Sequence, residues 1–268
     1  MVMRRALLLV IACGVAFGQS FEVASVKPSP HREPMLVGAT GGPGTNDPTT
    51  YHAENFNLDA LVLNAYGVRR YQLSAPEWTN DLRFDVMAKI PRGATRQDFL
   101  LMMQDLLRER FKLVTHRETK EMSGYQLVIA KNGPKIKESS EPFPTDPGID
   151  GSSRPALDGD GFPILPPGRW PWWTSWNSRS RRRVANMTME EFASDLSLQL
   201  MAPVTNATGL DAKYDFTLSW VFETSRPDAG GPDLFAAIQE QLGLKLDRKK
   251  VSVDMVVVDH IEKVPTEN

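Results

Sequence analysis

The stretch from Asn186 to Trp220 constrains the fold more than any other part of this 268-residue chain. Thr188 and Glu191 have the spacing of a capping box, in which each residue binds the other's backbone amide at the start of a helix. The apolar residues that follow recur on one helical stripe, made of Met189, Phe192, Ala193, Leu196 and Leu200. Pro203 ends this helix, and residues 214–220 then alternate between apolar and polar side chains. The stretch therefore predicts a helix, a turn and a half-buried strand.

An earlier segment repeats this pattern. At a constant offset along the sequence, Met189, Phe192, Ala193 and Leu196 are matched by the earlier stripe Leu58, Leu61, Val62 and Ala65. Asn57 occupies the N-cap position that Thr188 holds later, and an alternating strand at 84–90 precedes the one at 214–220 by nearly the same offset. The same helical phase and strand phase thus occur twice.

Two further elements follow in both halves. The first is a second helix. In the first half Thr95 caps its N-terminus, and in the second half it ends at Gly243, a residue suited to a left-handed C-cap. The second is a predicted hairpin, formed by 111–116 with 125–130 in the first half and by 244–247 with 251–261 in the second. The shared order predicts an α+β fold of two tandem copies of a small domain, each with helices packed on a mostly antiparallel sheet.

The spacing of these elements predicts four segments. Residues 1–18 form a signal peptide. Residues 19–131 form the first α+β repeat, including a Pro/Gly-rich loop at 28–50, and residues 183–268 form the second repeat. Between the repeats, residues 132–182 show no periodicity and are rich in proline, glycine, tryptophan and arginine, which favours a linker.

The N-terminus has the features of an export signal. Arg4 and Arg5 precede an apolar run of about a dozen residues, which is shorter than the roughly 20 that a membrane-spanning helix needs. Ala16-Phe17-Gly18 fits a signal peptidase site, which places the mature N-terminus at Gln19. The alternative is a lipoprotein anchored through Cys13, but the apolar run continues past that residue. We therefore expect a periplasmic or extracellular protein.

Charge and cysteine content exclude several classes of function. Removal of residues 1–18 takes away the only cysteine and two arginines, which leaves 29 basic and 33 acidic residues and a formal charge of −4. Such a chain has no disulfide and no thiolate nucleophile. Its mildly acidic balance predicts no specific binding of nucleic acid.

No catalytic or metal-binding motif is evident. The four histidines are far apart, so no zinc-type spacing exists, and phosphate loops, dinucleotide fingerprints and Gly-x-Ser-x-Gly elbows are absent. Asp85 and Asp215 occupy equivalent strands and could form an acid pair, but a structural role on the polar face of each strand is the simpler interpretation. We accordingly expect no cofactor, no metal and no assigned catalytic residue.

One run within the predicted linker has an unusual composition. It gathers four tryptophans and then four arginines, namely Trp170, Trp172, Trp173, Trp176, Arg179, Arg181, Arg182 and Arg183. Indoles stack on flat ligands or sit at membrane interfaces, while guanidinium groups pair with anions, so the run is a candidate binding surface. The alternative is that the tryptophans fold back over an exposed sheet face or a domain junction.

Several blocks together resemble one known family. These are FEVASVKPS near the N-terminus, RFKLVTHRETKEMSGYQLVIAKNGPK, TGLDAKYDFTLSW and the C-terminal segment QEQLGLKLDRKKVSVDMVVVDHIEK. In that order they resemble the acidobacterial duplicated-domain family, soil-associated exported proteins of unknown function. The resemblance implies export and internal duplication, and it supplies no catalytic residue.

The sequence as a whole favours a non-catalytic exported module that binds a partner in the cell envelope. An anionic glycan, a membrane surface or an envelope protein are the candidate partners. Two alternatives stay open: a hydrolase whose acidic groups meet only in the fold, and a structural or adhesion protein.

Overall fold

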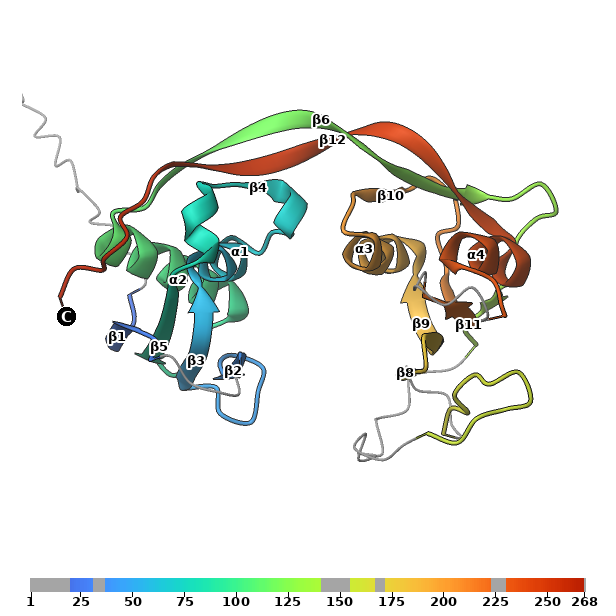
Figure 1. The fold of residues 1–268 in the computed structure, drawn as a ribbon, viewed down its shortest axis with the longest axis horizontal. Coiled ribbons are helices and arrows are strands. Elements are labelled where there is room, and N and C mark those ends of the chain that lie inside the picture. The colour runs from blue at the N-terminus through green and yellow to red at the C-terminus, as the bar shows by residue number, and fades with distance from the viewer. Residues whose placement is uncertain (1–19, 31–36, 141–154, 167–171, 223–229, 268) are drawn as a thin grey trace, which may run out of the picture. The chain divides into compact units, whose positions relative to one another are not determined.

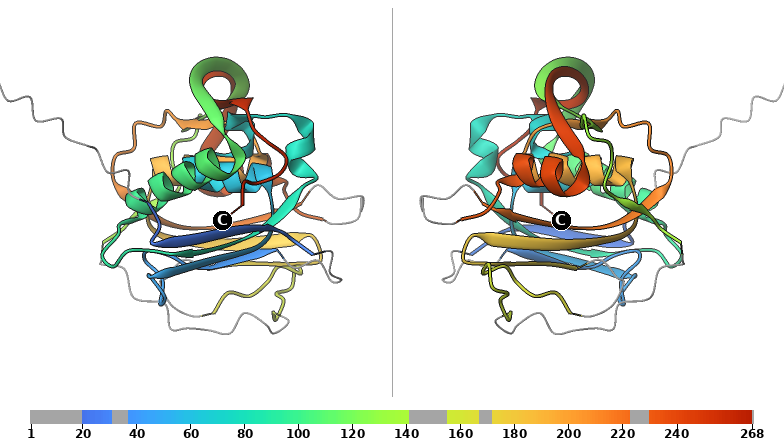
Figure 2. Two further views of the ribbon diagram at one scale, coloured as in Figure 1. Left: turned by 90° about the vertical axis from the view of Figure 1, so that its left-hand side faces the viewer. Right: turned by 90° about the vertical axis from the view of Figure 1, so that its right-hand side faces the viewer.

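The computed structural model describes residues 20–30, 37–140, 155–166, 172–222 and 230–267, which fold as two compact units (Figure 1). Unit 1 comprises Met1–Glu118 and Met255–Asn268, and unit 2 comprises Thr119–Asp254. Each unit has a four-stranded antiparallel sheet with two helices on one face (Figure 2). The predicted α+β class is therefore confirmed. The expected signal peptide, residues 1–18, lies outside the described residues.

The sheet of unit 1 has the strand order β1-β5-β3-β2. Its strands are β1 (Val23–Pro28), β5 (Arg83–Lys89), β3 (Thr50–Asn57) and β2 (Gly38–Gly41), and its helices are α1 (Leu58–Tyr66) and α2 (Arg96–Phe111). Two short 3₁₀ turns, Arg70–Gln72 and Glu77–Asn80, and the two-residue strand β4 (Leu73–Ser74) connect α1 to β5.

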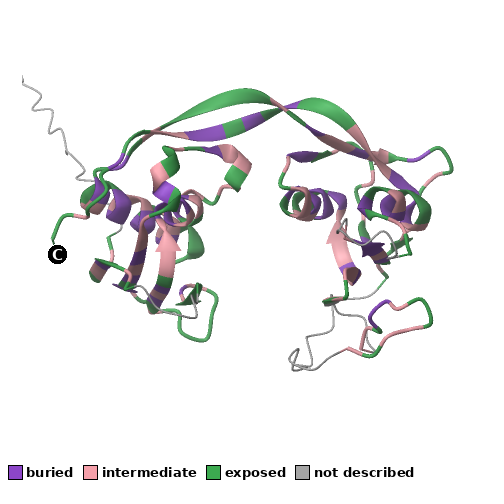
Figure 3. Cartoon of the chain, viewed as in Figure 1, coloured by how far each residue is buried: buried purple, intermediate pink, exposed green. Residues whose placement is uncertain are grey.

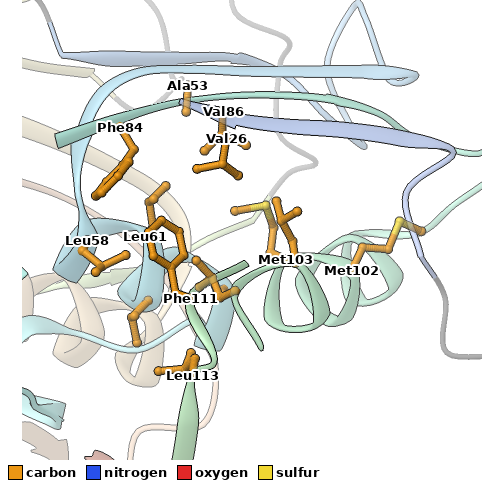
Figure 4. Packing of buried hydrophobic residues seen from close by; sticks show 14 of the residues in the cluster. Val26, Ala53, Leu58, Leu61, Phe84, Val86, Met102, Met103, Phe111 and Leu113 are labelled. Carbon is orange, nitrogen blue, oxygen red and sulfur yellow. The ribbon is translucent and has the colours of Figure 1, made fainter. Parts of the chain in front are cut away.

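The core of unit 1 lies between the helices and the sheet (Figure 4). Leu61 of α1 and Met103 of α2 are fully buried against the sheet residues Phe84 and Val86. The Phe84 ring meets the Phe111 ring edge to face at 4.9 Å between centroids, which adds specific geometry to the area that both bury. The predicted apolar stripe of α1 therefore faces the core, and so do the apolar residues of α2.

Unit 2 has the strand order β7-β11-β9-β8. Its strands are β7 (Lys137–Glu138), β11 (Lys213–Val221), β9 (Arg179–Thr188) and β8 (Trp172–Trp176), and its helices are α3 (Met189–Leu200) and α4 (Leu234–Leu242). Phe192 of α3 and Phe216 of β11 pack edge to face in its core, with ring centroids 4.9 Å apart. A three-residue strand, β10 (Val204–Asn206), follows α3.

The predicted helix ends are confirmed. The Thr188 hydroxyl accepts from the amide of Glu191 at 3.2 Å, and the Glu191 carboxylate accepts from the amide of Thr188 at 2.8 Å. These bonds from Thr188 lower the pKa of Glu191. Gly243 ends α4 with φ +65°, and a Cβ there would lie 2.0 Å from the carbonyl oxygen of Gly133, so both backbone angle and space require glycine.

Parts of the predicted linker and of the predicted loop form short sheet strands. Residues 132–182 contribute β7 and β8 to the sheet of unit 2, and residues 28–50 contribute β2 to that of unit 1. These strands are two to five residues long and lie at sheet edges, where few side chains alternate between core and solvent. Periodicity alone therefore missed them.

The two predicted hairpins are wrong. Each is replaced by one continuous strand, β6 (Val114–Ile129) and β12 (Leu244–His260), and these two strands pair with each other. The charged residues 117–121, interpreted as a hairpin turn, lie within β6 and are exposed, as Figure 3 shows. They contain no glycine, proline or asparagine, the residues that tight turns favour.

Candidate functional site

The Trp/Arg run forms most of a β-hairpin. Strand β8 leads into β9 through a two-residue turn, in which Asn177 has φ +47° and Ser178 has φ +65°. Positive φ at both positions is the geometry of a type I′ turn, whose twist matches that of paired strands. Because side chains alternate along each strand, the run is divided between the two faces of the sheet. Trp170 and the side chain of Trp172 lie outside the described residues.

Three arginines lie on the face of β9 that points away from the helices. Arg181 forms an ion pair with Asp158 at 2.7 Å and donates to the carbonyl of Pro163 at 3.2 Å. Arg183 donates to the carbonyl of Pro166 at 2.6 Å, and Arg179 donates to that of Gly230 at 3.3 Å. These guanidinium groups therefore bind the chain's own acceptors, and those of Arg181 and Arg183 hold residues 158–166 against this face of the sheet.

Contacts around Phe162 add to this attachment. The guanidinium carbon of Arg181 lies 5.4 Å from the centre of the Phe162 ring, and that of Arg179 lies 5.8 Å from it, both within cation–π range. At Asp158, partial desolvation opposes ionisation, but the bonds from Arg181 and from the Phe162 amide outweigh it and lower the pKa. The carboxylate thus stays ionised opposite Arg181.

The other face of the hairpin borders a groove of about 690 Å³. Its apolar lining includes Trp173 of the edge strand β8, Leu198 of α3 and Met201, which follows α3. The remaining lining residues are Arg182, Asp195, Gln199 and Trp220. Trp173, Leu198 and Met201 are 57%, 54% and 61% exposed, so three large apolar side chains meet solvent at one place. Such clustering is typical of interaction sites.

Polar groups fix the walls of this groove. Arg182 forms an ion pair with Asp195 of α3, and the Trp173 indole donates to the Ser180 hydroxyl at 2.6 Å. The Trp220 side chain is only 4% exposed, and its indole nitrogen has no hydrogen-bond partner among the described residues. A buried donor without a partner costs about 1 to 3 kcal/mol. The groove therefore combines an apolar surface with one unsatisfied donor.

Strand β8 also has a free edge. It is the last strand in the order β7-β11-β9-β8, and within the described part of the chain no strand pairs with its outer side. An edge strand presents a row of backbone donors and acceptors to which another extended chain can bind. The edge and the groove are adjacent because Trp173 belongs to both.

The two aspartates have structural roles in their own units. The Asp85 carboxylate accepts from the amide of Asn55 at 2.9 Å and from the Ser29 hydroxyl, and Asp215 makes the same contacts with Asn186, at 2.8 Å, and Ser139. Both asparagines have positive φ, 59° and 55°, at irregular points in the strand pairing. Each aspartate thus stabilises a β-bulge, as the structural interpretation predicts.

The three histidines within the described residues each lie near a single carboxylate, whereas His31 lies outside those residues. His52 lies 3.6 Å from Glu54 and His260 lies 3.9 Å from Glu262. Within the described ranges, no group of three His, Cys, Asp or Glu side chains is placed to hold a metal ion. None of the helices in those ranges is long and apolar enough to cross a lipid bilayer.

His116 allows a pH-dependent prediction. Its Nδ1 lies 2.8 Å from the Asp259 carboxylate, and this hydrogen bond raises the pKa of His116 above its usual range. The change Asp259→Asn should lower that pKa towards about 6.5 in an NMR titration. Asp254→Asn, which alters the hydrogen-bond partner of Thr119, is the control and should leave the pKa of His116 unchanged.

The sign of the effect on stability follows from the raised pKa. Protonated His116 contributes its full stabilisation below the unfolded-state pKa of about 6.5, and loses it as the pH rises through the higher folded-state value. An unchanged His116 pKa in Asp259→Asn would contradict the assigned contact.

Sequence reasoning found Trp173 and Arg182 but missed the helix side of the groove. Leu198 falls outside the apolar stripe of α3, and Met201 follows the helix in a left-handed conformation with φ +50°. An apolar residue outside the buried stripe was the signal that could have identified this wall. Trp220, the last residue of the predicted half-buried strand, is buried in the core of unit 2.

Comparison with known proteins identifies a family but no activity. A family model described as "Protein of unknown function (DUF3738)" matches residues 59–261. No curated protein matches the chain. No solved structure matches it either.

Proposed function

Because the chain belongs to this family of unknown function, DUF3738, we propose a function from its own geometry: it is a non-catalytic module that binds an extended polypeptide segment. The segment adds as a strand to the free edge of β8, and one of its apolar side chains enters the groove beside Trp173. Backbone hydrogen bonds give affinity in this mode of recognition, and the pocket gives specificity.

The observation that carries the proposal is the position of the groove between an edge strand and a helix. Trp173 belongs to the edge strand β8, Leu198 belongs to α3 and Met201 follows it, so a strand added along β8 would lie beside a groove that all three line. The exposed thioether and indole offer an adaptable apolar surface.

The contacts that the arginines already make within the chain favour a polypeptide partner over an anionic polymer. Arg179, Arg181 and Arg183 already contact carbonyl or carboxylate oxygens of their own chain. Arg182 faces the groove, but it is paired with Asp195. A polyanion would have to replace these contacts, whereas an added strand uses the free edge of β8.

The partner follows from the expected location. With export of the mature chain, the bound segment belongs to another protein of the cell envelope. Mass spectrometry of natively produced protein should find Gln19 at the N-terminus, because the Ala-x-Gly site precedes it. A lipid-modified Cys13 would contradict this and support the lipoprotein alternative.

We also propose that the two sequence repeats, 19–131 and 183–268, are tandem copies, in agreement with the resemblance to the acidobacterial duplicated-domain family. Three features support this. The strand orders β1-β5-β3-β2 and β7-β11-β9-β8 correspond element by element. Both sheets contain a bulge with a left-handed asparagine bound to an aspartate. The equivalent helix stripes match position by position at one constant offset along the sequence.

The binding proposal is tested by selecting peptides on the mature protein and measuring their affinity for variants. Trp173→Ser and Met201→Ser should each weaken binding about 30-fold, the loss typical of an interface residue worth about 2 kcal/mol or more. Met87→Ser is the matched control, because Met87 is 60% exposed, like Met201 at 61%, but lies on β5 of unit 1. It should bind within about twofold of the unmodified protein.

Equal losses in all three variants would show that the groove is not the site. Failure to select any peptide that distinguishes Trp173→Ser from the unmodified protein would overturn the proposal.

A further inference from the structure

The two long strands are divided between the units. Residues of β6 up to Glu118 belong to unit 1 and those from Thr119 belong to unit 2, whereas β12 belongs to unit 2 up to Asp254 and to unit 1 from Met255. Each half of the sequence therefore contributes the end of its long strand to the unit built mainly by the other half. We call residues 119–129 and 255–261 the two arms.

The strand pairing of the arms shows a reciprocal relation. In unit 1, Leu73 of β4 pairs in parallel with Val256 of β12. In unit 2, Val204 of β10 pairs in parallel with Tyr125 of β6. Leu73 and Val204 hold equivalent positions in the two halves of the sequence, by the offset that relates the helix stripes, and so do Tyr125 and Val256. The register is thus the same in both units, but the partner comes from the opposite half of the sequence.

The arms also complete the hydrophobic cores. Val256 is 1% exposed within the core of unit 1, where Ile261 is buried too. Leu127 is fully buried within the core of unit 2. By contrast, Leu113, just before β6, and Leu244, at the start of β12, are buried in the unit of their own half. Each long strand therefore starts in the unit of its own half and crosses to the other unit before its arm begins.

We infer that the two arms, at the ends of β6 and β12, are exchanged between the units, so that the chain is a strand-swapped pair of domains within one polypeptide. The unexchanged form is the hairpin that each half predicts from its sequence. In such a hairpin His116 would face Val128, whereas in the exchanged form it faces Asp259, which holds the position equivalent to Val128 in the second half. The inference concerns the assembly of the units and stands whether or not the groove binds a peptide.

Local sequence favours the open form. Residues 117–121 and 248–250, where the predicted hairpins would turn, contain no glycine, proline, asparagine or aspartate. The nearest glycine, Gly124, is used for close packing, because a Cβ there would lie 2.5 Å from the carbonyl oxygen of Pro203 and 2.9 Å from a Val251 methyl. Because these segments lack turn residues and Gly124 is needed for packing, the continuous strand is favoured over the hairpin.

Disulfide trapping tests the inference on the intact chain with Cys13 changed to Ser. The pair His116→Cys with Asp259→Cys should form an intrachain disulfide under mild oxidation. The matched pair His116→Cys with Val128→Cys should retain free thiols. His116 and Asp259 are about half exposed, so these changes spare the core. The reverse result, or a disulfide-linked dimer from the first pair, would overturn exchange within one chain.

Cleavage provides a second test. A protease site inserted between Asn132 and Gly133 separates the two sequence halves after folding. Exchange predicts that the cut halves elute together in size-exclusion chromatography at the mass of the uncut chain, and separate only in denaturant. Separate elution under native conditions would show that the arms do not hold the units together.

Discussion

Replacing Leu127 with alanine should lower the free energy of unfolding by about 2 to 5 kcal/mol, the usual cost of truncating a buried leucine. Leu127 lies in the first half of the sequence, yet its side chain is fully buried in the core of unit 2. Amide hydrogen exchange should therefore accelerate in α3 and α4. Denaturant titration measures the first effect, and exchange followed by mass spectrometry locates the second.

Ile129→Ala is the control for this prediction. Ile129 lies on the same strand but is 37% exposed, so its truncation should cost clearly less than that of Leu127. Equal losses at both positions would contradict the placement of Leu127. Faster exchange confined to α1 and α2 would contradict the assignment of this arm to unit 2.

Replacing Phe192 with alanine should cost about 3 to 5 kcal/mol. Its side chain is 1% exposed and packs edge to face on Phe216. Phe235→Ala is the matched control, since Phe235 is 39% exposed on α4 and should lose much less. The midpoints and slopes of urea titrations give both values. An unchanged midpoint for Phe192→Ala would show that the apolar face of α3 is assigned incorrectly.

The sequence predicted the elements that local chemistry determines. The capping box of Thr188 and Glu191, the N-caps Asn57 and Thr95 and the C-cap Gly243 are all in place. The apolar stripes of α1, α2 and α3 face their cores as expected. Caps and stripes involve residues within a few positions of each other, so a single sequence is enough to recognise them.

Long-range pairings were harder to predict. Residues 125–130 were correctly expected to form a strand, but their partner lies in the other half of the sequence, and periodicity does not distinguish the two partners. Strands β2, β7 and β8 are short edge strands with little alternation. Asn177 and Ser178 between alternating segments were the available signal for the β8–β9 hairpin.

The candidate site was predicted only in part. The composition of the run from Trp170 to Arg183 drew attention to the hairpin, but composition does not show which face of the sheet a side chain occupies. Arg179, Arg181 and Arg183 bind the chain's own acceptors, whereas Trp173 and Arg182 line the groove. Leu198 and Met201, which also line the groove, come close to Trp173 only in the folded chain.

Amide hydrogen exchange of unit 2 with and without a selected peptide tests the central claim most directly. A peptide that adds to the edge of β8 forms backbone hydrogen bonds with it, so amides in residues 172–176 should exchange more slowly when the peptide is bound. The corresponding edge strand of unit 1, β2, should be unchanged. Slower exchange in β8 alone is the result that we predict. Slower exchange confined to other strands, with β8 unaffected, would contradict the proposed mode of binding.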